Sequence, residues 1–368
     1  MSSGGRFPHR AKALLYLVGL AGVVLSAGCM GWLKIHGTTQ TRYAYVATGN
    51  AIAQYMVTIN GLLVPLSTAS VSATNPVAIC ATHDAKFVYA AEKSANDVLQ
   101  YSTGIAGTLT PLSPATVHTG THPVAIAVTP NGQFVYVLNH DDNTISQFGA
   151  ATDGTLLPLS PATVAVANDG DSLVISPNGN FLYATSYTSG KVSAYSIGGT
   201  GQLAPLTVAT YDVTSPTGPA ISPNGNFLYV PASVAGVAQF SIAVDGSLTP
   251  LTPPTVPTPG AGNDTAAVTP DGNSVYIGVF NGGNPGSPVA QFSVNVDGTL
   301  TALVPASVAA GNAPQFVDVE PDGKFAYVAN GNDGTVSQFS IGGNGTLSAL
   351  SPATVNPAGA LQIAFVKK

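Results

Sequence analysis

From residue 42 onwards, hydrophobic and polar positions alternate with the period of two that is typical of β-strands. The alternating segments are short, and turns rich in proline, asparagine and glycine separate them. One unit can be followed over residues 123–164, where PVAIAVT, QFVYVLN, NTISQFGA and LLPLSPATV each have strand character. PNG and DGTL supply tight turns after the first and third segments. The pattern predicts a unit of four antiparallel strands, which we call A to D.

The unit recurs along the chain with two fixed anchors. One is a tyrosine in strand B, and the other is a Gly-x-Leu step after strand C. The tyrosines stand 44 to 51 residues apart and are Tyr45, Tyr89, Tyr136, Tyr183, Tyr229, Tyr276 and Tyr327. The glycines are Gly61, Gly107, Gly154, Gly201, Gly246, Gly298 and Gly345. Seven repeats with a period in the forties predict a seven-bladed β-propeller.

The two ends of the repeat region complement each other. ALQIAFV at 360–366 has the pattern of strand A and is followed only by two lysines, whereas RYAYVAT at 42–48 resembles strand B without a preceding strand A. We expect the C-terminal strand to complete the N-terminal blade, because this closes the ring without an open sheet edge. The predicted fold class is therefore all-β: a seven-bladed propeller with four-stranded blades.

The N-terminal residues have a different character. Arg6, Arg10 and Lys12 precede the apolar run 13–29, as in a secretory signal peptide. SAGC at 26–29 resembles a bacterial lipobox, in which Cys29 would carry the lipid. We expect a lipoprotein-type signal peptide over 1–28, a tether over 29–42 and the propeller over 43–368; an ordinary signal peptide cut nearby is the alternative. Either leader predicts export, and the lipoprotein predicts the bacterial outer membrane, periplasm or cell surface.

Charge narrows the set of partners. Removing residues 1–28 takes away three of the 11 basic residues and none of the 17 acidic ones, which leaves a net charge of −9. Nucleic acid and anionic membrane surfaces are unfavourable partners for such a chain. We expect a monomer that contacts the membrane only through its lipid anchor. No G-x-S-x-G, H-E-x-x-H or P-loop motif occurs in the sequence, and no cofactor is expected.

Candidate binding residues cluster in the connections that differ between blades. In a propeller, the D–A and B–C connections share one face, and variable loops on a rigid scaffold commonly carry function. The expected ligand-face residues are Lys93, His118, Asp141, Asp142, Asp169, Asp171, Asn284 and Asp333, with Asp97 and Asp264 on the same face. These loops are expected to be solvated polar loops without a metal; the alternative is a divalent cation at His118, His122, His140 and Asp141.

Candidate acid–base residues are Glu92, His122, His140 and Asp318. Asp318 comes from strand A, which is expected to line the central channel. The residues of strand A that should face the channel are small and nearly uncharged, and Asp318 is the only carboxylate among them.

In PNGQFVYVLN, PDGKFAYVANGNDGTVSQF and NPVAI, the chain resembles the seven-bladed lactonase-like propellers with YVTN-type repeats, over residues 43–366. Members with 6-phosphogluconolactonase activity carry Pro-Arg-His entering strand A and a glutamate after strand B. The resemblance implies that Glu92 corresponds to that glutamate, whereas the Arg-His pair has no counterpart. The pairs at its position are Val77-Ala78, Val124-Ala125, Asp171-Ser172, Thr217-Gly218, Asp264-Thr265 and Gln315-Phe316.

Three functions agree with these observations. The first is a ligand- or partner-binding module at the cell envelope, with a small molecule, a glycan or an envelope protein as partner. The second is a lactone hydrolase acting on a neutral sugar lactone, because a phosphosugar requires an Arg or Lys clamp and Arg42 is the only arginine after the expected signal peptide. The third is a structural envelope protein. A charge-poor surface rich in Thr, Ser and Asn favours the first and third.

Overall fold

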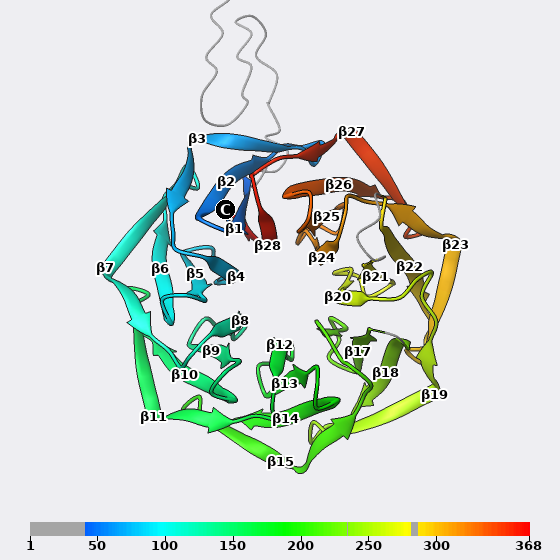
Figure 1. Ribbon diagram of the computed structural model, residues 1–368, viewed down its shortest axis with the longest axis horizontal. Helices are drawn as coiled ribbons and strands as arrows, with labels where there is room; N and C mark the ends of the chain where they lie inside the picture. The colour runs from blue at the N-terminus through cyan, green and yellow to red at the C-terminus, as the bar shows by residue number, and fades with distance from the viewer. Residues whose placement is uncertain (1–40, 234, 281–285) are drawn as a thin grey trace, which may run out of the picture. The chain divides into compact units, whose positions relative to one another are not determined.

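The computed structural model describes residues 41–233, 235–280 and 286–368. The expected signal peptide, Cys29, most of the tether and Asn284 lie outside these residues. All regular elements in the described ranges are β-strands, and they form seven four-stranded antiparallel sheets arranged as blades around a channel (Figure 1). No helix in this part of the chain has the length and apolar character needed to cross a membrane. The predicted seven-bladed propeller is confirmed.

Each blade contributes one strand to each of four concentric layers, and every layer is described in the order of blades 1 to 7. The innermost strands are β28 (Ala360–Lys367), β4 (Pro76–Ala81), β8 (Pro123–Val128), β12 (Gly170–Ile175), β16 (Ala220–Ile221), β20 (Asn263–Val268) and β24 (Pro314–Val319). The second strands are β1 (Arg42–Thr48), β5 (Phe87–Glu92), β9 (Phe134–Asn139), β13 (Phe181–Ser186), β17 (Phe227–Ala232), β21 (Ser274–Val279) and β25 (Phe325–Asn330). The third strands are β2 (Ala51–Val57), β6 (Asp97–Thr103), β10 (Thr144–Ala150), β14 (Lys191–Ile197), β18 (Gly236–Ile242), β22 (Pro288–Val294) and β26 (Thr335–Ile341). The outermost strands are β3 (Leu63–Ser72), β7 (Leu109–His118), β11 (Leu156–Ala165), β15 (Leu203–Asp212), β19 (Leu248–Val256), β23 (Leu300–Ala309) and β27 (Leu347–Val355).

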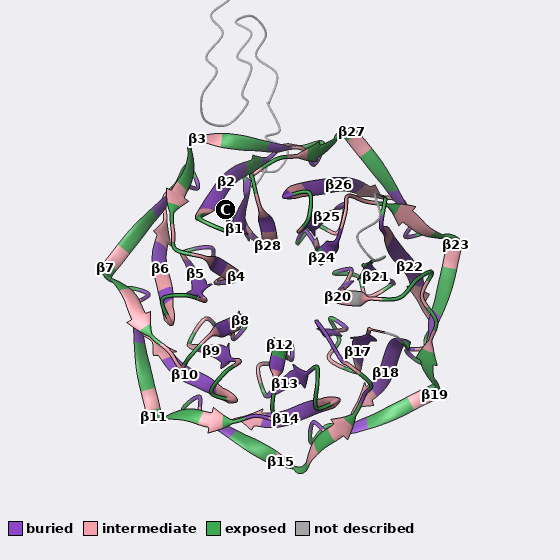
Figure 2. Ribbon diagram, in the orientation of Figure 1, coloured by how far each residue is buried: buried purple, intermediate pink, exposed green. Residues whose placement is uncertain are grey.

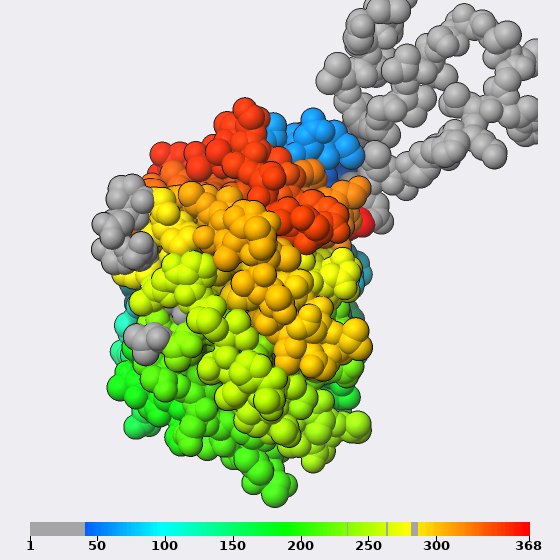
Figure 3. All heavy atoms as spheres, turned by 90° about the vertical axis from the view of Figure 1, so that its right-hand side faces the viewer, coloured from blue at the N-terminus to red at the C-terminus, as the bar shows by residue number. Residues whose placement is uncertain are grey.

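The core lies between the blades. Second strands such as β9 and β13 are buried along nearly their whole length, because neighbouring blades cover both of their faces (Figure 2). Outermost strands such as β11 are mostly exposed, which is where proline is tolerated in a sheet. In the space-filling view from the side, segments of successive blades follow one another in chain order across the visible face, from green through yellow and orange to red (Figure 3). A single blade buries neither face well, so stability comes from stacking the blades.

The ring closes as the sequence predicts. β28 pairs antiparallel with β1, so the last strand of the chain is the innermost strand of blade 1. β1 begins at Arg42, one residue before the expected start of the propeller. An ion pair of Arg42 with Glu320 also stabilises the closure. Arg42 Nη1 lies 2.6 Å from both carboxylate oxygens of the fully buried Glu320, and Nη2 donates to the Thr58 carbonyl. This pair ties blade 1 to the A–B turn of blade 7.

The two sequence anchors are partners across the blade interfaces. In every blade, the buried tyrosine hydroxyl donates to the anchor glycine carbonyl of the following blade, at 2.6 to 2.8 Å. Tyr183 thus reaches Gly246, and Tyr327 reaches Gly61 across the closing interface. Gly246 has a φ of +81°, and a Cβ there would overlap the Phe181 ring of the preceding blade.

Buried glutamines reinforce six of these interfaces. Each lies on a third strand, accepts a hydrogen bond from the anchor Leu N–H of the next blade, and donates to a carbonyl of its own outermost strand; they are Gln54, Gln100, Gln147, Gln239, Gln291 and Gln338. In blade 4, Ala194 occupies this position, and the Tyr211 hydroxyl accepts from Leu248 N instead.

Tyr183→Phe tests the tyrosine–glycine bond. The substitution removes one hydroxyl and leaves the Gly246 carbonyl without this donor in a buried interface, so we expect the free energy of unfolding to fall by about 1–3 kcal/mol. Urea denaturation gives the value. Tyr187→Phe is the control, because Tyr187 is exposed and its change should stay within about 0.5 kcal/mol. Equal stability of the two variants would contradict the assignment.

Candidate functional site

The D–A and B–C connections open at one face of the ring, which we call the loop face, and the A–B and C–D turns form the opposite turn face. The innermost strands run from the loop face towards the turn face. All seven blades share this arrangement in the described part of the chain, so the first residues of each innermost strand lie at the channel mouth on the loop face.

A β-bulge at the start of the innermost strands sets which side chains stand at the mouth. In β12 the pairing shifts between Gly170 and Ser172, which leaves Asp171 as the extra residue. In β20 the shift falls between Asn263 and Ala266 and includes Asp264. Bulges bend a strand and re-aim the extra side chain. The corresponding bulge residues of β4, β8, β24 and β28 carry no charge; they are Val77, Val124, Gln315 and Leu361.

The pKa values of the two carboxyl groups at the mouth are both raised. Burial, together with the charge of Asp169, raises the pKa of Asp171 to about 6, and the charge of His140 partly offsets this rise. Burial and the charge of Asp171 raise the pKa of Asp264 to about 7. The Asp171 side chain keeps contact with solvent and Asp264 is half-buried, so the burial that raises both pKa values comes from the channel wall around them and not from full enclosure. Both pKa values are thus raised towards neutral pH.

A cavity of about 280 Å³ lies between the innermost strands. Ser172 and Thr265, which directly follow the two mouth carboxyls, are among its lining residues. Among the residues that the structure describes, no lysine or arginine lines it. Asp318 also lines the cavity. It pairs with Tyr327, and the equivalent pair in blade 4 is Val174 with Tyr183. Because Val174 lies three residues after Asp171, Asp318 lies about 10 Å further towards the turn face than Asp171.

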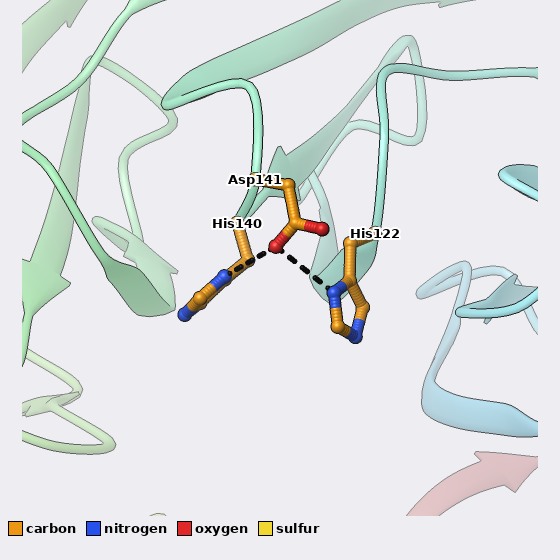
Figure 4. Close-up of side chains that lie close together, drawn as sticks. All are labelled: His122, His140 and Asp141. Atoms are coloured by element: carbon orange, nitrogen blue, oxygen red, sulfur yellow. Dashed lines mark hydrogen bonds and ion pairs between the residues drawn. The ribbon is translucent and has the colours of Figure 1, made fainter.

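A second group of polar side chains lies on the loop face, away from the innermost strands. His122 comes from the connection between β7 and β8, and His140 and Asp141 from the connection between β9 and β10. Asp141 Oδ1 lies 2.9 Å from His122 Nδ1 and 2.8 Å from His140 Nδ1 (Figure 4). His140 Nε2 lies 2.5 Å from Asp169 Oδ1. Asp169 belongs to the connection between β11 and β12, so the four side chains form a continuous chain across three connections.

The backbone holds His122 in place. Its φ of +61° is left-handed, which is uncommon for a residue with a side chain, and Asn75, Asp169 and Ala313 adopt the same conformation just before their own innermost strands. The His122 N–H donates to Asn96 Oδ1 at 2.8 Å, and its carbonyl accepts from His140 N at 2.9 Å. His122 and His140 are therefore fixed relative to each other by main-chain contacts as well as through Asp141.

Several predicted site residues instead anchor loops. Glu92 is buried and accepts a hydrogen bond from Thr74 N, and burial raises its pKa. Asp142 accepts from Thr121 N at 2.6 Å, and Asp333 from Asn312 N at 2.5 Å. In each case, this contact holds the incoming D–A connection against the B–C connection.

The remaining predicted residues are spread over the face. His118 ends the outermost strand β7, is exposed, and pairs with Asp97, so it does not join the group of His122, His140 and Asp141. Lys93 lines a shallow depression of about 550 Å³ together with His122 and Asp141. Among the described residues, neither Glu92 nor Asp318 makes a hydrogen bond or ion pair with the two histidines. The four acid–base candidates therefore do not form one cluster.

The coupling of Asp171 and Asp264 was not predicted. The sequence pattern places both residues on the loop face but does not indicate that they form a pair. The one signal is that both residues stand at the position where the resemblance to the lactonases implies the arginine of Pro-Arg-His.

Seven four-stranded blades, with polar chemistry at the channel mouth and on the loops around it, define a seven-bladed propeller of the lactonase type. The chain belongs to the family described as "Lactonase, 7-bladed beta-propeller", whose model matches residues 45–168, 106–217 and 274–366. None of the curated proteins matches the sequence.

Solved structures share the fold at low sequence identity. A candidate 6-phosphogluconolactonase from Bacteroides fragilis is 23% identical with a TM-score of 0.77, over 89% of this chain and 98% of that one. The periplasmic gluconolactonase of Pseudomonas aeruginosa is 19% identical with a TM-score of 0.73, over 89% of this chain and 99% of that one. A protein from Lactobacillus plantarum is 21% identical with a TM-score of 0.76, over 89% and 99%. These likenesses support the fold.

Asp318→Asn tests the electrostatics of the channel. Burial raises the Asp318 pKa to about 7, so between pH 4 and 7 the folded chain keeps a proton that the unfolded chain releases. This group's contribution to stability therefore falls as pH rises, and the full cost is present above pH 7. We expect the variant to be more stable than the parent by about 1–3 kcal/mol at pH 8 and equal to it at pH 4. Thermal unfolding at both pH values measures the difference; a difference independent of pH would refute this account.

Proposed function

We propose that this protein hydrolyses an uncharged lactone at the channel mouth, with Asp171 and Asp264 as the acid–base pair. The observation that carries the proposal is the placement of these two carboxyl groups on bulges of the innermost strands, in a chain that belongs to the lactonase family. The names of the gluconolactonase and 6-phosphogluconolactonase neighbours agree with lactone chemistry, although their low identity supports only the fold.

Lactone opening needs one proton removed and one supplied. The ionised carboxylate of the pair accepts a proton from the attacking water as its oxygen bonds to the lactone carbonyl carbon. The protonated member then donates to the ring oxygen as the C–O bond breaks, which yields a hydroxy acid. The pKa values of about 6 and about 7 suit Asp171 as the base and Asp264 as the acid.

The charge of the site favours an uncharged substrate. In the described part of the chain no lysine or arginine lines the cavity, and Arg42 is paired with Glu320 at the closing interface. A phosphate group would meet carboxylates at the mouth without a cationic partner. We therefore do not expect a phosphorylated lactone to be turned over.

Export and lipid anchoring at Cys29 are part of this proposal and stay predictions. They are supported by the basic start and apolar run of the first 29 residues. The binding-module and structural hypotheses also stay predictions, and the activity assay below separates them from the hydrolase.

Turnover of gluconolactone and of 6-phosphogluconolactone tests the activity. We expect the chain to open the uncharged lactone faster than the spontaneous reaction and to leave the phosphorylated lactone at the spontaneous rate. The rate should follow a bell-shaped pH profile between pH 6 and 7, because the base acts only above its pKa and the acid only below its own. Base titration at constant pH records each rate.

Asp171→Asn and Asp264→Asn should each lower turnover by about 10²- to 10⁴-fold. Asp212→Asn is the matched control, because Asp212 is exposed at the end of an outermost strand and pairs with Lys191; its activity should equal that of the parent. Turnover that survives both mouth substitutions would refute the assigned pair. Gluconolactone that binds without turnover would refute the hydrolase and favour the binding module.

A further inference from the structure

We propose that His122, His140 and Asp141 form a binding site for one divalent transition-metal ion, such as Zn²⁺, on the loop face. The proposal does not rest on the hydrolase, because these residues lie in the connections of blades 2 and 3 and not on the innermost strands. It rests on three observations: the spacing of the donors, the orientation of the His140 ring, and the main-chain support of both histidines.

The donor atoms are spaced as metal ligands require. One ligand atom from each of the three residues lies within 4.8 Å of the others, and Asp141 Oδ1 is 2.8 and 2.9 Å from the two Nδ1 atoms. Zn²⁺ binds imidazole nitrogen and carboxylate oxygen at about 2.0–2.2 Å, which sets neighbouring ligands about 3–3.5 Å apart. Small side-chain rotations therefore suffice to admit an ion between the carboxylate and the two rings.

The His140 ring is already oriented as a ligand. A metal-bound histidine commonly gives its other ring N–H to a carboxylate, which fixes the tautomer and the ring plane. Asp169 Oδ1 occupies that place, 2.5 Å from His140 Nε2. When Nε2 carries the proton of the neutral ring, the lone pair of Nδ1 points towards Asp141 Oδ1, 2.8 Å away. Both atoms are then hydrogen-bond acceptors, and they repel each other unless a proton or a cation lies between them.

Asp169 is itself held in position. Its carboxylate accepts hydrogen bonds from the Thr188 N–H and hydroxyl, and its own N–H donates to Asn143 Oδ1 at 2.9 Å. It enters β12 through the same left-handed conformation with which His122 enters β8. The ligand His122 and the supporting Asp169 thus occupy equivalent positions in neighbouring blades, on either side of the loop that carries His140 and Asp141.

The surroundings leave room for an ion and for water. His122 and His140 are half-buried and Asp141 is exposed, so solvent completes the coordination of an ion bound there. Asp142 and Asp169 add negative charge nearby, against one cation, Lys93, in the same depression. Two imidazoles and one carboxylate suit Zn²⁺, Co²⁺, Ni²⁺ or Cu²⁺ better than Ca²⁺ or Mg²⁺, which prefer all-oxygen sites.

Metal titration of the full chain, produced without a polyhistidine tag, tests this site. We expect one Co²⁺ per chain with the visible absorption of a nitrogen- and oxygen-bound ion, displaced by one equivalent of Zn²⁺. Calorimetry with Zn²⁺ should give at least about 10-fold weaker binding for His122→Gln, His140→Gln and Asp141→Asn. Asp169→Asn, which leaves all three ligands in place but alters the support of His140, should weaken binding by about 10- to 100-fold.

His118→Gln is the matched control, because His118 also pairs with an aspartate on this face but lies at the outer end of blade 2. Its affinity for Zn²⁺ should equal that of the parent. Circular dichroism and thermal unfolding check that each variant keeps its fold. Absence of saturable binding overturns the proposal, as does binding that survives His122→Gln and His140→Gln or that His118→Gln weakens equally. Lactone turnover does not enter this readout, so the two proposals fail separately.

Discussion

The hydrogen bond from each strand-B tyrosine to the glycine carbonyl of the next blade is the constraint on which the ring depends. It occurs at all seven interfaces with nearly the same length. A buried carbonyl must be paired. The same C–D turn must also hold its glycine in a left-handed conformation and donate a leucine N–H, which a glutamine accepts at six interfaces and Tyr211 accepts at the seventh. The anchor glycine and leucine therefore recur in all seven turns, whereas the histidines and most of the carboxylates that differ between blades lie on the loop face.

Where a blade departs from the repeat, a compensating contact accompanies the change. Ala194 replaces the interface glutamine in blade 4, and the Tyr211 hydroxyl takes over its acceptor role. Glu320 replaces the Ser or Thr that begins the other A–B turns, and Arg42 neutralises it. The loops of blades 2 to 4, which carry the candidate metal site, follow the same rule. Asp142 and Asn96 make the hydrogen bonds that hold these loops, and His122, His140 and Asp141 are the residues that differ from the other blades.

The fold could be predicted from the sequence because its determinants are local and repeated. Strand alternation, turn residues and the two anchors each recur within one unit, and the unmatched ends indicated closure. The sites depend on which side chains meet, and that information is not local. His118 and His122 are four residues apart in the sequence, yet the chain between them crosses from the outer edge of one blade to the inner edge of the next, a distance of about three strand spacings, or about 14 Å.

The carboxyl pair at the channel mouth was not predicted for a related reason, which is the position of the β-bulges. One extra residue in β12 and in β20 breaks the alternation by a single position, so the pattern of small channel-facing residues pointed to Asp318 and away from Asp171 and Asp264. The partnership of Arg42 with Glu320 was missed because the two residues lie at opposite ends of the repeat region. Its signal was the one A–B turn that begins with a carboxylate.

The closing interface also determines how the domain responds to mechanical force. β1 is hydrogen-bonded to β28 on one side and to β2 on the other, and Arg42 at its start is fastened to blade 7. A pull on residue 41 along the axis of β1 therefore loads two ladders in shear at once, with their bonds sharing the tension instead of breaking one after another. A pull on Lys368 acts on β28, which has a strand partner on one side only. Traction on residue 41 is therefore resisted by two strand ladders, and traction on Lys368 by one ladder together with the contacts of Lys367 with Asp322 and of Lys368 with the Thr103 and Gly104 carbonyls.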